Sequence, residues 1–331
     1  AVLTSADLKA RGLGAQKPDV PRQKSDGSPA YVTPQPLLAD DRVRFVGQPV
    51  AFVVAETLAQ AKDAAELIDI DYDPLPAVVN IEQATAGAAQ TVWDDNPGNE
   101  AFFHEVGDAS ATETAFAKAD HVVRHRIVIN RITANSMEPR GCIGEYDKID
   151  DHYTIRCTIQ SVHGTRAVLA GAYFRKPQKH FRVICDNMGG GFGMKGGCYP
   201  EYVLSLWAAE VIGRPVKWIA ERSEGILCDE QARDSVIEAE LALDKNGKFL
   251  GLRSLAKTAM GAYNTTDRNV NPTIVALSCL VNTYKTPTIH ARVMGIFTNT
   301  MTIAFYRGGG RPEPLYIIER LVDKAARQLG I

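Results

Sequence analysis

The run MGGGFGMKGG at residues 188–197 is the strongest local signal of the fold in this 331-residue sequence. Four glycines within the five positions 189–193 let the backbone approach a bound group closely and present its N–H groups to it. The run follows a predicted strand at residues 181–186 and precedes an apolar predicted helix at residues 199–212. We therefore expect a strand, a glycine loop and a helix in succession.

Taken alone, this glycine loop has two further interpretations. Gly191, Gly193 and Gly196 satisfy the dinucleotide fingerprint G-x-G-x-x-G. Glu221 ends the next predicted strand, at about the distance where a ribose-binding acid would lie. This interpretation, a NAD-type oxidoreductase, predicts alternating parallel strands around Gly191. A tight turn that needs positive φ angles is the plainer alternative.

A second glycine run, YRGGGRPE at residues 306–313, stands at the start of the last predicted helix, residues 313–329. Pro312 suits the first turn of a helix, where free N–H groups can receive an anion. Arg307 and Arg311 lie inside the glycine loop and favour such an anion site. A flexible turn between domains is the alternative.

Hydrophobic period and turn signals place the other elements. Residues 43–54 predict two short strands around a turn, and Thr57 with Gln60 predicts a capped helix start. Residues 68–73 alternate apolar residues with aspartates, which indicates a strand with one wet face. The polar stretch 84–100 predicts a boundary. Farther on, the same signals predict strands at residues 121–130 and 216–220, two strands within 144–160, a helix at 162–174 and a hairpin of residues 235–243 and 249–258.

The composition, with 45% hydrophobic and 23% charged residues, is that of a globular protein with a sizeable core. A net charge of −2 without a basic block argues against a nucleic-acid partner. The six cysteines form no close cluster, so we expect free thiols in the cytoplasm. No apolar stretch is long enough to span a membrane. The chain opens on Ala1 without a methionine, and we expect it to be part of a longer polypeptide.

The motifs together resemble the large subunit of molybdenum hydroxylases, the superfamily of xanthine dehydrogenase, aldehyde oxidase and carbon monoxide dehydrogenase. Residues 43–79 resemble its hammerhead α/β domain. The remaining motifs follow in the family's order: Met137-Glu138-Pro139-Arg140, Gln160, Met188 to Lys195, and Tyr306 to Glu313. The resemblance implies an α+β fold, with a partial hammerhead domain at residues 1–88 and the first part of a molybdopterin-binding region at residues 89–331.

The resemblance also implies roles for individual residues. Gln160 resembles the glutamine whose amide hydrogen-bonds a ligand of molybdenum, and Arg307 matches an arginine on the opposite loop. Gly190, Gly191, Phe192 and Gly193 match the backbone cradle beside the metal and its pterin. The protein itself supplies no metal ligand in this family. The general base is a glutamate in a Gly-x-Gly-Glu setting, which this chain lacks, so we expect the chain to be inactive without the remaining C-terminal part of a large subunit.

Three glycines narrow the expected substrate. Gly308 stands where carbon monoxide dehydrogenases have a cysteine, which argues against a copper site. Gly196 and Gly309 replace the acid and the aromatic residue of purine-oxidising members. These three positions would line the substrate pocket, and the resemblance is closest to carbon-monoxide-dehydrogenase-like chains that lack the active-site cysteine. We expect oxidative hydroxylation of an aldehyde or an N-heterocycle, with water as the oxygen source.

The expected cofactor is molybdopterin, as the cytosine dinucleotide, with molybdenum. Electrons must leave the metal, and without a cysteine cluster this chain cannot hold an iron–sulfur centre. The resemblance therefore implies an iron–sulfur subunit and an FAD subunit as partners in a hetero-oligomer, beside the rest of the large subunit and a small-molecule substrate. A NAD-type oxidoreductase and a non-catalytic cofactor-binding or assembly fragment are the alternatives.

Overall fold

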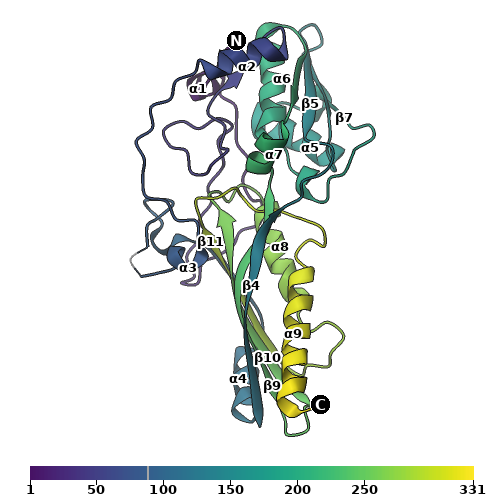
Figure 1. Ribbon diagram of the computed structural model, residues 1–331. Helices are drawn as coiled ribbons and strands as arrows, with labels where there is room; N and C mark the ends of the chain where they lie inside the picture. The colour runs from purple at the N-terminus through teal and green to yellow at the C-terminus, as the bar shows by residue number, and fades with distance from the viewer. Residues whose placement is uncertain (88) are drawn as a thin grey trace. The chain divides into compact units, whose positions relative to one another are not determined.

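A computed structural model describes residues 1–87 and 89–331, with mixed helices and sheets (Figure 1). This confirms the α+β prediction. The chain divides into two compact units, each assembled from three segments. The first unit contains residues 1–17, 34–76 and 134–229, and the second contains residues 18–33, 77–133 and 230–331. The predicted domain division after residue 88 stays a prediction, and residue 88 itself lies outside the described residues.

The first unit contains a four-stranded sheet in the order β7-β6-β5-β8. Its strands are β5 (Gly141–Asp147), β6 (His152–Cys157), β7 (Phe181–Ile184) and β8 (Val216–Ile219). β6 and β7 are parallel, whereas β5 is antiparallel to both β6 and β8. This is not the alternating parallel sheet that the dinucleotide alternative requires. The NAD-type interpretation of the glycine loop was therefore wrong.

Helices pack on one face of this sheet and leave the other exposed. Cys142 and Gly144 of β5 are buried on the face toward the helices, whereas Glu145 and Asp147 on the opposite face are exposed. α6 (Pro200–Ile212) approaches so closely that a Cβ on Gly144 would lie 2.7 Å from the carbonyl carbon of Ser205. α5 (Val162–Val168) and the π-helical η2 (Leu169–Phe174) follow β6 and join the same core. These elements confirm the predicted strands and helices of this region.

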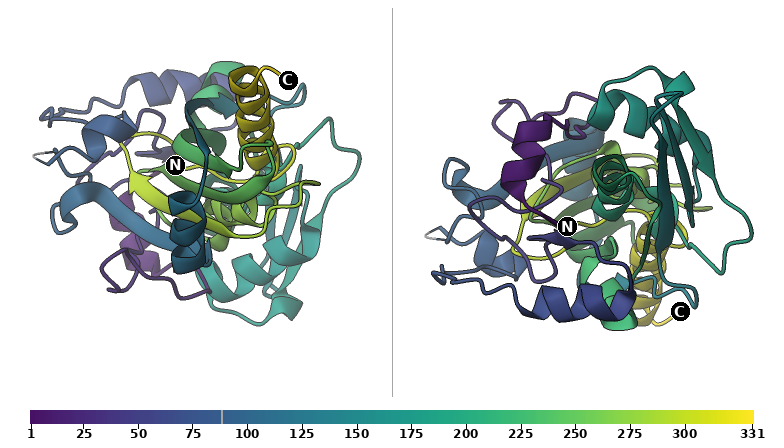
Figure 2. Two further views of the ribbon diagram at one scale, coloured as in Figure 1. Left: turned by 90° about the horizontal axis from the view of Figure 1, so that it is seen from below. Right: turned by 90° about the horizontal axis from the view of Figure 1, so that it is seen from above.

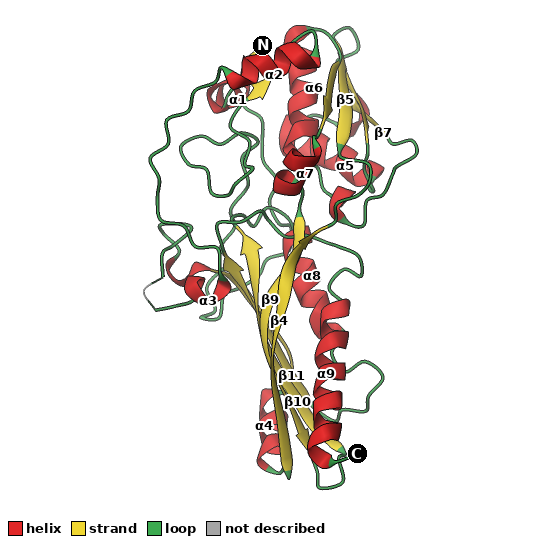
Figure 3. Ribbon diagram, viewed as in Figure 1, coloured by secondary structure: helices red, strands yellow, loops and turns green. Residues whose placement is uncertain are grey.

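The N-terminal part of the first unit consists of short elements. β1 (Val2–Leu3) pairs antiparallel with β2 (Phe52–Val53), and the chain between α1 (Ser5–Arg11) and α2 (Leu58–Glu66) is mostly loop (Figure 3). Thr57 caps α2, since the Gln60 N–H donates to Thr57 Oγ1 at 3.2 Å. The predicted capping box is confirmed. The first of the two strands predicted within residues 43–54 does not form.

Residues 68–73 form no strand, so that prediction was wrong. A strand is held by hydrogen bonds to a neighbour, and this segment has no paired strand among residues 1–87 and 89–331. Ile70 and Tyr72 are 38% and 54% exposed. Alternation alone was therefore not sufficient to fix a strand.

The second unit is built on a five-stranded sheet in the order β3-β11-β10-β9-β4. Its strands are β3 (Glu100–Gly107), β4 (His121–Thr133), β9 (Gln231–Leu243), β10 (Phe249–Gly261) and β11 (Ile289–Phe297). β10 and β11 are parallel and the other pairs are antiparallel. β9 and β10 confirm the predicted hairpin, and β4 confirms the strand predicted from residue 121.

Helices cover both faces of this second sheet, which Figure 2 shows from its two ends. Arg253 of β10 lies over the Phe116 ring of α4 (Ala109–Ala117), at 4.1 Å from the ring centre. The alternate residues Ser254 and Ala256 face α8 (Asp267–Ser278) and α9 (Pro312–Leu329). The remaining short helices are α3 (Ile81–Ala84), α7 (Arg222–Cys228), η1 (Pro97–Asn99), η3 (Gln178–His180) and η4 (Met194–Gly196). No helix in the described part of the chain is long and apolar enough to cross a bilayer.

Candidate functional site

The glycine loop of the first unit turns sharply between β7 and η4. Gly190 and Gly193 have φ angles of +99° and +100°, which L side chains rarely adopt. Phe192 lies between them with φ 51°, a conformation that costs a residue with a Cβ about 1–2 kcal/mol. Such a loop keeps its shape only when its surroundings hold it.

Gln160 lies beside this loop, as the resemblance implied. Its backbone N–H donates to the Lys195 carbonyl at 2.8 Å, and the Gly193 N–H donates to Gln160 Oε1 at 2.9 Å. A backbone N–H can only meet the acceptor end of an amide, so the side chain must point Oε1 toward Gly193. Gln160 Nε2 is then directed away from Gly193, and it has no hydrogen-bond partner among residues 1–87 and 89–331.

The loop also has free backbone N–H donors and a close contact between its backbone and Gln160. The N–H groups of Gly190, Gly191 and Phe192 find no acceptor in the described part of the chain. A Cβ on Gly191 would lie 2.7 Å from Gln160 Oε1, so any larger residue there would displace the Gln160 side chain. Free N–H groups and an amide donor thus gather around one short stretch of backbone.

Glu138 closes the loop from the other side. Its Oε2 accepts from the Gly189 N–H at 2.9 Å and from Lys195 Nζ at 2.8 Å. Burial would raise the pKa of this carboxyl, but the hydrogen bonds from Lys195 and Gly189 outweigh it and hold the pKa of Glu138 below its ordinary value. Glu138 is therefore an anion that joins the two ends of the loop.

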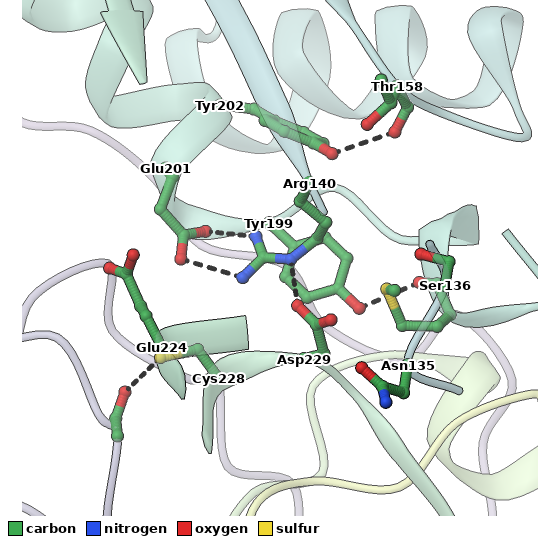
Figure 4. A network of polar contacts seen from close by, with 12 residues as sticks. Asn135, Ser136, Arg140, Thr158, Tyr199, Glu201, Tyr202, Glu224, Cys228 and Asp229 are labelled. Carbon is green, nitrogen blue, oxygen red and sulfur yellow. Dashed lines mark hydrogen bonds and ion pairs between the residues drawn. The ribbon is translucent and has the colours of Figure 1, made fainter. Parts of the chain in front are cut away.

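Arg140, two residues farther on, is the centre of a buried charge network (Figure 4). Its guanidinium donates to both carboxylate oxygens of Glu201, at 2.8 and 3.1 Å, and to Asp229 at 2.5 Å. The guanidinium carbon lies 3.8 Å from the centre of the Tyr199 ring. Burial opposes the charge, but the pKa of Arg140 is raised well above its ordinary value by Glu201. Burial also raises the pKa of Glu224, which Figure 4 shows near Glu201.

Metal-binding side chains do not cluster in the part of the chain that the structure describes. No group of three or more His, Cys, Asp or Glu side chains that could hold a metal ion occurs within residues 1–87 and 89–331. Burial raises the pKa of the Cys142 thiol to about 12, which disfavours the thiolate that binds metals.

The second glycine loop belongs to the second unit. Gly308, Gly309 and Gly310 have φ angles of 94°, 58° and 87°. Arg233 donates to the Arg307 carbonyl at 3.1 Å and forms an ion pair with Glu313 at the start of α9. The Arg307 side chain is exposed. The loop is therefore anchored through its main chain, with its arginine free to meet another group.

The structure brings part of the predicted set together. Gln160 contacts Gly193, and the backbone of Gly190, Gly191 and Phe192 lies in the same loop. Gly196 ends η4 in the same unit. Arg307, Gly308 and Gly309 lie in the second unit.

Sequence reasoning missed the charged residues that support this site. Glu138 and Arg140 stood in a recognised motif but had no role, and Lys195 was read only as part of the glycine run. The available signal was the position of these charged residues beside glycines and apolar strand residues. Charged side chains are almost never fully buried without partners, so charges in such a setting indicate ion pairs.

Two family models match the chain. The molybdopterin cofactor-binding domain matches residues 92–331. The a/b hammerhead domain of aldehyde oxidase and xanthine dehydrogenase matches residues 2–76.

Relatives and solved structures point the same way. The chain is 36% identical over 300 residues to the 6-hydroxypseudooxynicotine dehydrogenase complex subunit gamma of Paenarthrobacter nicotinovorans, covering 89% of this chain and 36% of that one. It is 32% identical to the carbon monoxide dehydrogenase large chain of Afipia carboxidovorans, covering 99% and 41%. It superimposes on quinoline 2-oxidoreductase of Pseudomonas putida 86 with a TM-score of 0.88 and 33% identity, covering 100% and 41%.

The chain thus spans 36–41% of the length of these relatives. The cofactor-binding model covers most of the chain, and the glycine loop and Gln160 lie within it. The chain therefore belongs to the molybdenum hydroxylase family of molybdopterin-binding large subunits, which includes xanthine dehydrogenase, aldehyde oxidase and carbon monoxide dehydrogenase.

Proposed function

We propose that this chain holds the molybdopterin site of a molybdenum hydroxylase that oxidises an aldehyde or an N-heterocycle with oxygen from water. The observation that carries the proposal is the contact between Gln160 and the glycine loop, at 2.9 Å from Gly193. It assembles a polar amide and a glycine cradle from two separate parts of the chain.

The residues present fit such a cofactor. A molybdenum-bound oxygen or sulfur is a hydrogen-bond acceptor, and the donors around the loop, Gln160 Nε2 and the N–H groups of Gly191 and Phe192, have no acceptor among the described residues. A Cβ on Gly191 would fill the space at the cradle. Within residues 1–87 and 89–331 no cluster of His, Cys, Asp or Glu could bind the metal directly, which suits a metal whose sulfur ligands come from the pterin.

Each group would have a separate task. When bound, the molybdenum–pterin group supplies two-electron oxidation of a carbon centre. Gln160 would donate through Nε2 to a ligand of the metal and so orient it, while Gly193 holds the opposite end of the amide. The N–H groups of the loop would stabilise negative charge beside the metal. Arg307 would bind the cofactor from the second glycine loop. No residue of this chain is assigned as the general base.

The substrate class follows from what the loops lack. Gly196, Gly308 and Gly309 carry no side chain that could clamp a purine, and Gly308 cannot bind copper as a cysteine would. The solved relative acts on quinoline, which is an N-heterocycle. We propose an N-heterocycle or an aldehyde accordingly, with the three glycines at the substrate pocket.

Analysis of the purified complex for molybdenum, pterin and nucleotide tests the proposal. We expect one molybdenum and one molybdopterin cytosine dinucleotide for each chain, together with the visible absorption of iron–sulfur and FAD subunits in a cytoplasmic hetero-oligomer. A complex without molybdenum and pterin would reject the proposed function. A complex that holds pterin but turns over no aldehyde or N-heterocycle would favour the non-catalytic alternative.

Replacement of Gln160 by Ala should leave the pterin bound and slow turnover by about 10–100-fold, because one donor to a metal ligand is lost rather than a binding surface. Pterin content and kcat are measured on the same preparation. Gln178→Ala is the matched control, since Gln178 is an exposed amide of the same unit whose Oε1 accepts from Arg166. Equal turnover in the two variants would remove Gln160 from the site.

A further inference from the structure

Glu138 joins the two ends of the glycine loop through one atom. Its Oε2 accepts from the N–H of Gly189, the first glycine of the loop, and from the ammonium of Lys195 behind the last turn, at 2.9 and 2.8 Å. The Glu138 N–H also donates to the Gly189 carbonyl at 3.3 Å. Three hydrogen bonds therefore fix the loop to one residue of a separate segment.

Lys195 has a buried side chain that pairs with the partly exposed Glu138. The side chain of Lys195 is 0% exposed, whereas that of Glu138 is 35% exposed. A buried ion pair is weak evidence for a stabilising role, because apolar residues of similar volume commonly stabilise a fold as well or better. The pair therefore calls for an explanation other than stability.

A main-chain hydrogen bond connects Lys195 of this pair to Gln160. The Lys195 carbonyl accepts the Gln160 N–H at 2.8 Å, and the Gln160 side chain returns to the loop at the Gly193 N–H. Any displacement of Lys195 therefore moves the backbone that carries Gln160. The direction of the free Nε2 is set by both ends of this chain of hydrogen bonds.

Glu138 is itself held in place. Arg222 donates to the carbonyls of Ser136 and Met137, at 2.8 Å each, directly before Glu138. Two residues after Glu138, Arg140 is held by the carboxylates of Glu201 and Asp229. The carboxylate of Glu138 thus extends from a rigid segment, as a positioning group needs.

We propose that Glu138 and Lys195 are a positioning pair that sets the conformation of the glycine loop and, through it, the direction of Gln160 Nε2. Neither residue touches the substrate in this proposal. The role toward the cofactor rests on the proposed function, whereas the effect on the loop does not.

A double-mutant comparison tests the pair. Glu138→Gln, Lys195→Met and the double variant are made in the full chain and purified as the complex. Glu138→Gln leaves the buried Lys195 ammonium without its charged partner, and Lys195→Met leaves the partly exposed Glu138 carboxylate without the hydrogen bond from Lys195, so both single variants should have a lower Tm than the wild type. The double variant removes both charges, and its Tm should return toward the wild-type value.

In the double variant, turnover and the protection of the loop from hydrogen exchange should not recover together with the Tm. We expect kcat to stay about 10–100-fold low in the double variant, because the Lys195 anchor is still missing. Hydrogen exchange of a peptide covering residues 186–196 should remain faster than in the wild type, since the Gly193 N–H is no longer held. Lys62→Met is the control, because Lys62 belongs to an exposed pair with Glu221 and should leave all three readouts unchanged.

Recovery of kcat and exchange together with Tm in the double variant would overturn the proposal and leave the pair with a structural role alone. Unchanged exchange in both single variants would overturn it as well. A wild-type complex without molybdenum or pterin would reject the proposed function, while the exchange measurement would still decide whether the pair holds the loop.

Discussion

Replacement of Arg140 by Met should lower the free energy of unfolding of the first unit by about 3–5 kcal/mol, the cost of breaking a buried ion pair from one side. The Arg140 side chain is 0% exposed, and those of Glu201 and Asp229 are 7% and 6% exposed. Without the guanidinium, two carboxylates stay buried with no positive charge between them. Urea denaturation followed by tryptophan fluorescence measures the change, since Trp218 lies 5.1 Å from the Arg140 guanidinium.

Arg214→Met is the matched control for this measurement. Arg214 is 75% exposed and lies 3.8 Å from Glu56, which is 81% exposed. Such a surface pair contributes little, about 0–1 kcal/mol. Similar losses in the two variants would mean that the buried network does not stabilise the first unit as its geometry indicates.

Replacement of Gly191 by Ala should lower turnover by at least about 100-fold, because a misplacement of about 1 Å at a reacting centre has effects of this size. The added Cβ would lie 2.7, 2.8 and 2.9 Å from Oε1, Cδ and Cγ of Gln160. The Gln160 side chain must therefore move away, and its hydrogen bond from the Gly193 N–H is lost. Pterin content and kcat of the purified complex measure the result.

Gly171→Ala is the control for Gly191. Gly171 lies in η2 with nothing within 4 Å of an added Cβ, so alanine should be accepted without loss. Wild-type turnover in Gly191→Ala would show that Gln160 does not need its contact with the loop.

Hydrophobic periodicity and turn residues were sufficient to predict the elements whose hydrogen-bonding partners lie nearby in the chain. The hairpin of β9 and β10 was predicted from alternation on both sides of Asn246 and Gly247, and its strands pair with each other. The cap at Thr57 depends on a residue three positions away. The contact of Gln160 with the glycine loop came from the resemblance to a family rather than from period or spacing.

The features that could not be predicted depend on distant partners. Glu138 and Lys195 are 57 residues apart, and Arg140 is 61 and 89 residues from Glu201 and Asp229. No local pattern specifies which acid a buried base will meet. α8 was missed because Pro272 lies inside it, and tertiary packing overrides that low helix propensity.

The exposed segment at residues 68–73 also affects how the protein behaves at high concentration. Ile70 and Tyr72 are exposed on a backbone that pairs with no strand among the described residues, and exposed apolar residues on unpaired backbone can seed aggregation between copies. Asp69, Asp71 and Asp73 alternate with the apolar residues. If two copies paired this segment antiparallel about Asp71, aspartates would face aspartates at every second position, and like charges directly opposite destabilise a ladder. In such a pairing the three carboxylates would oppose self-association of this segment.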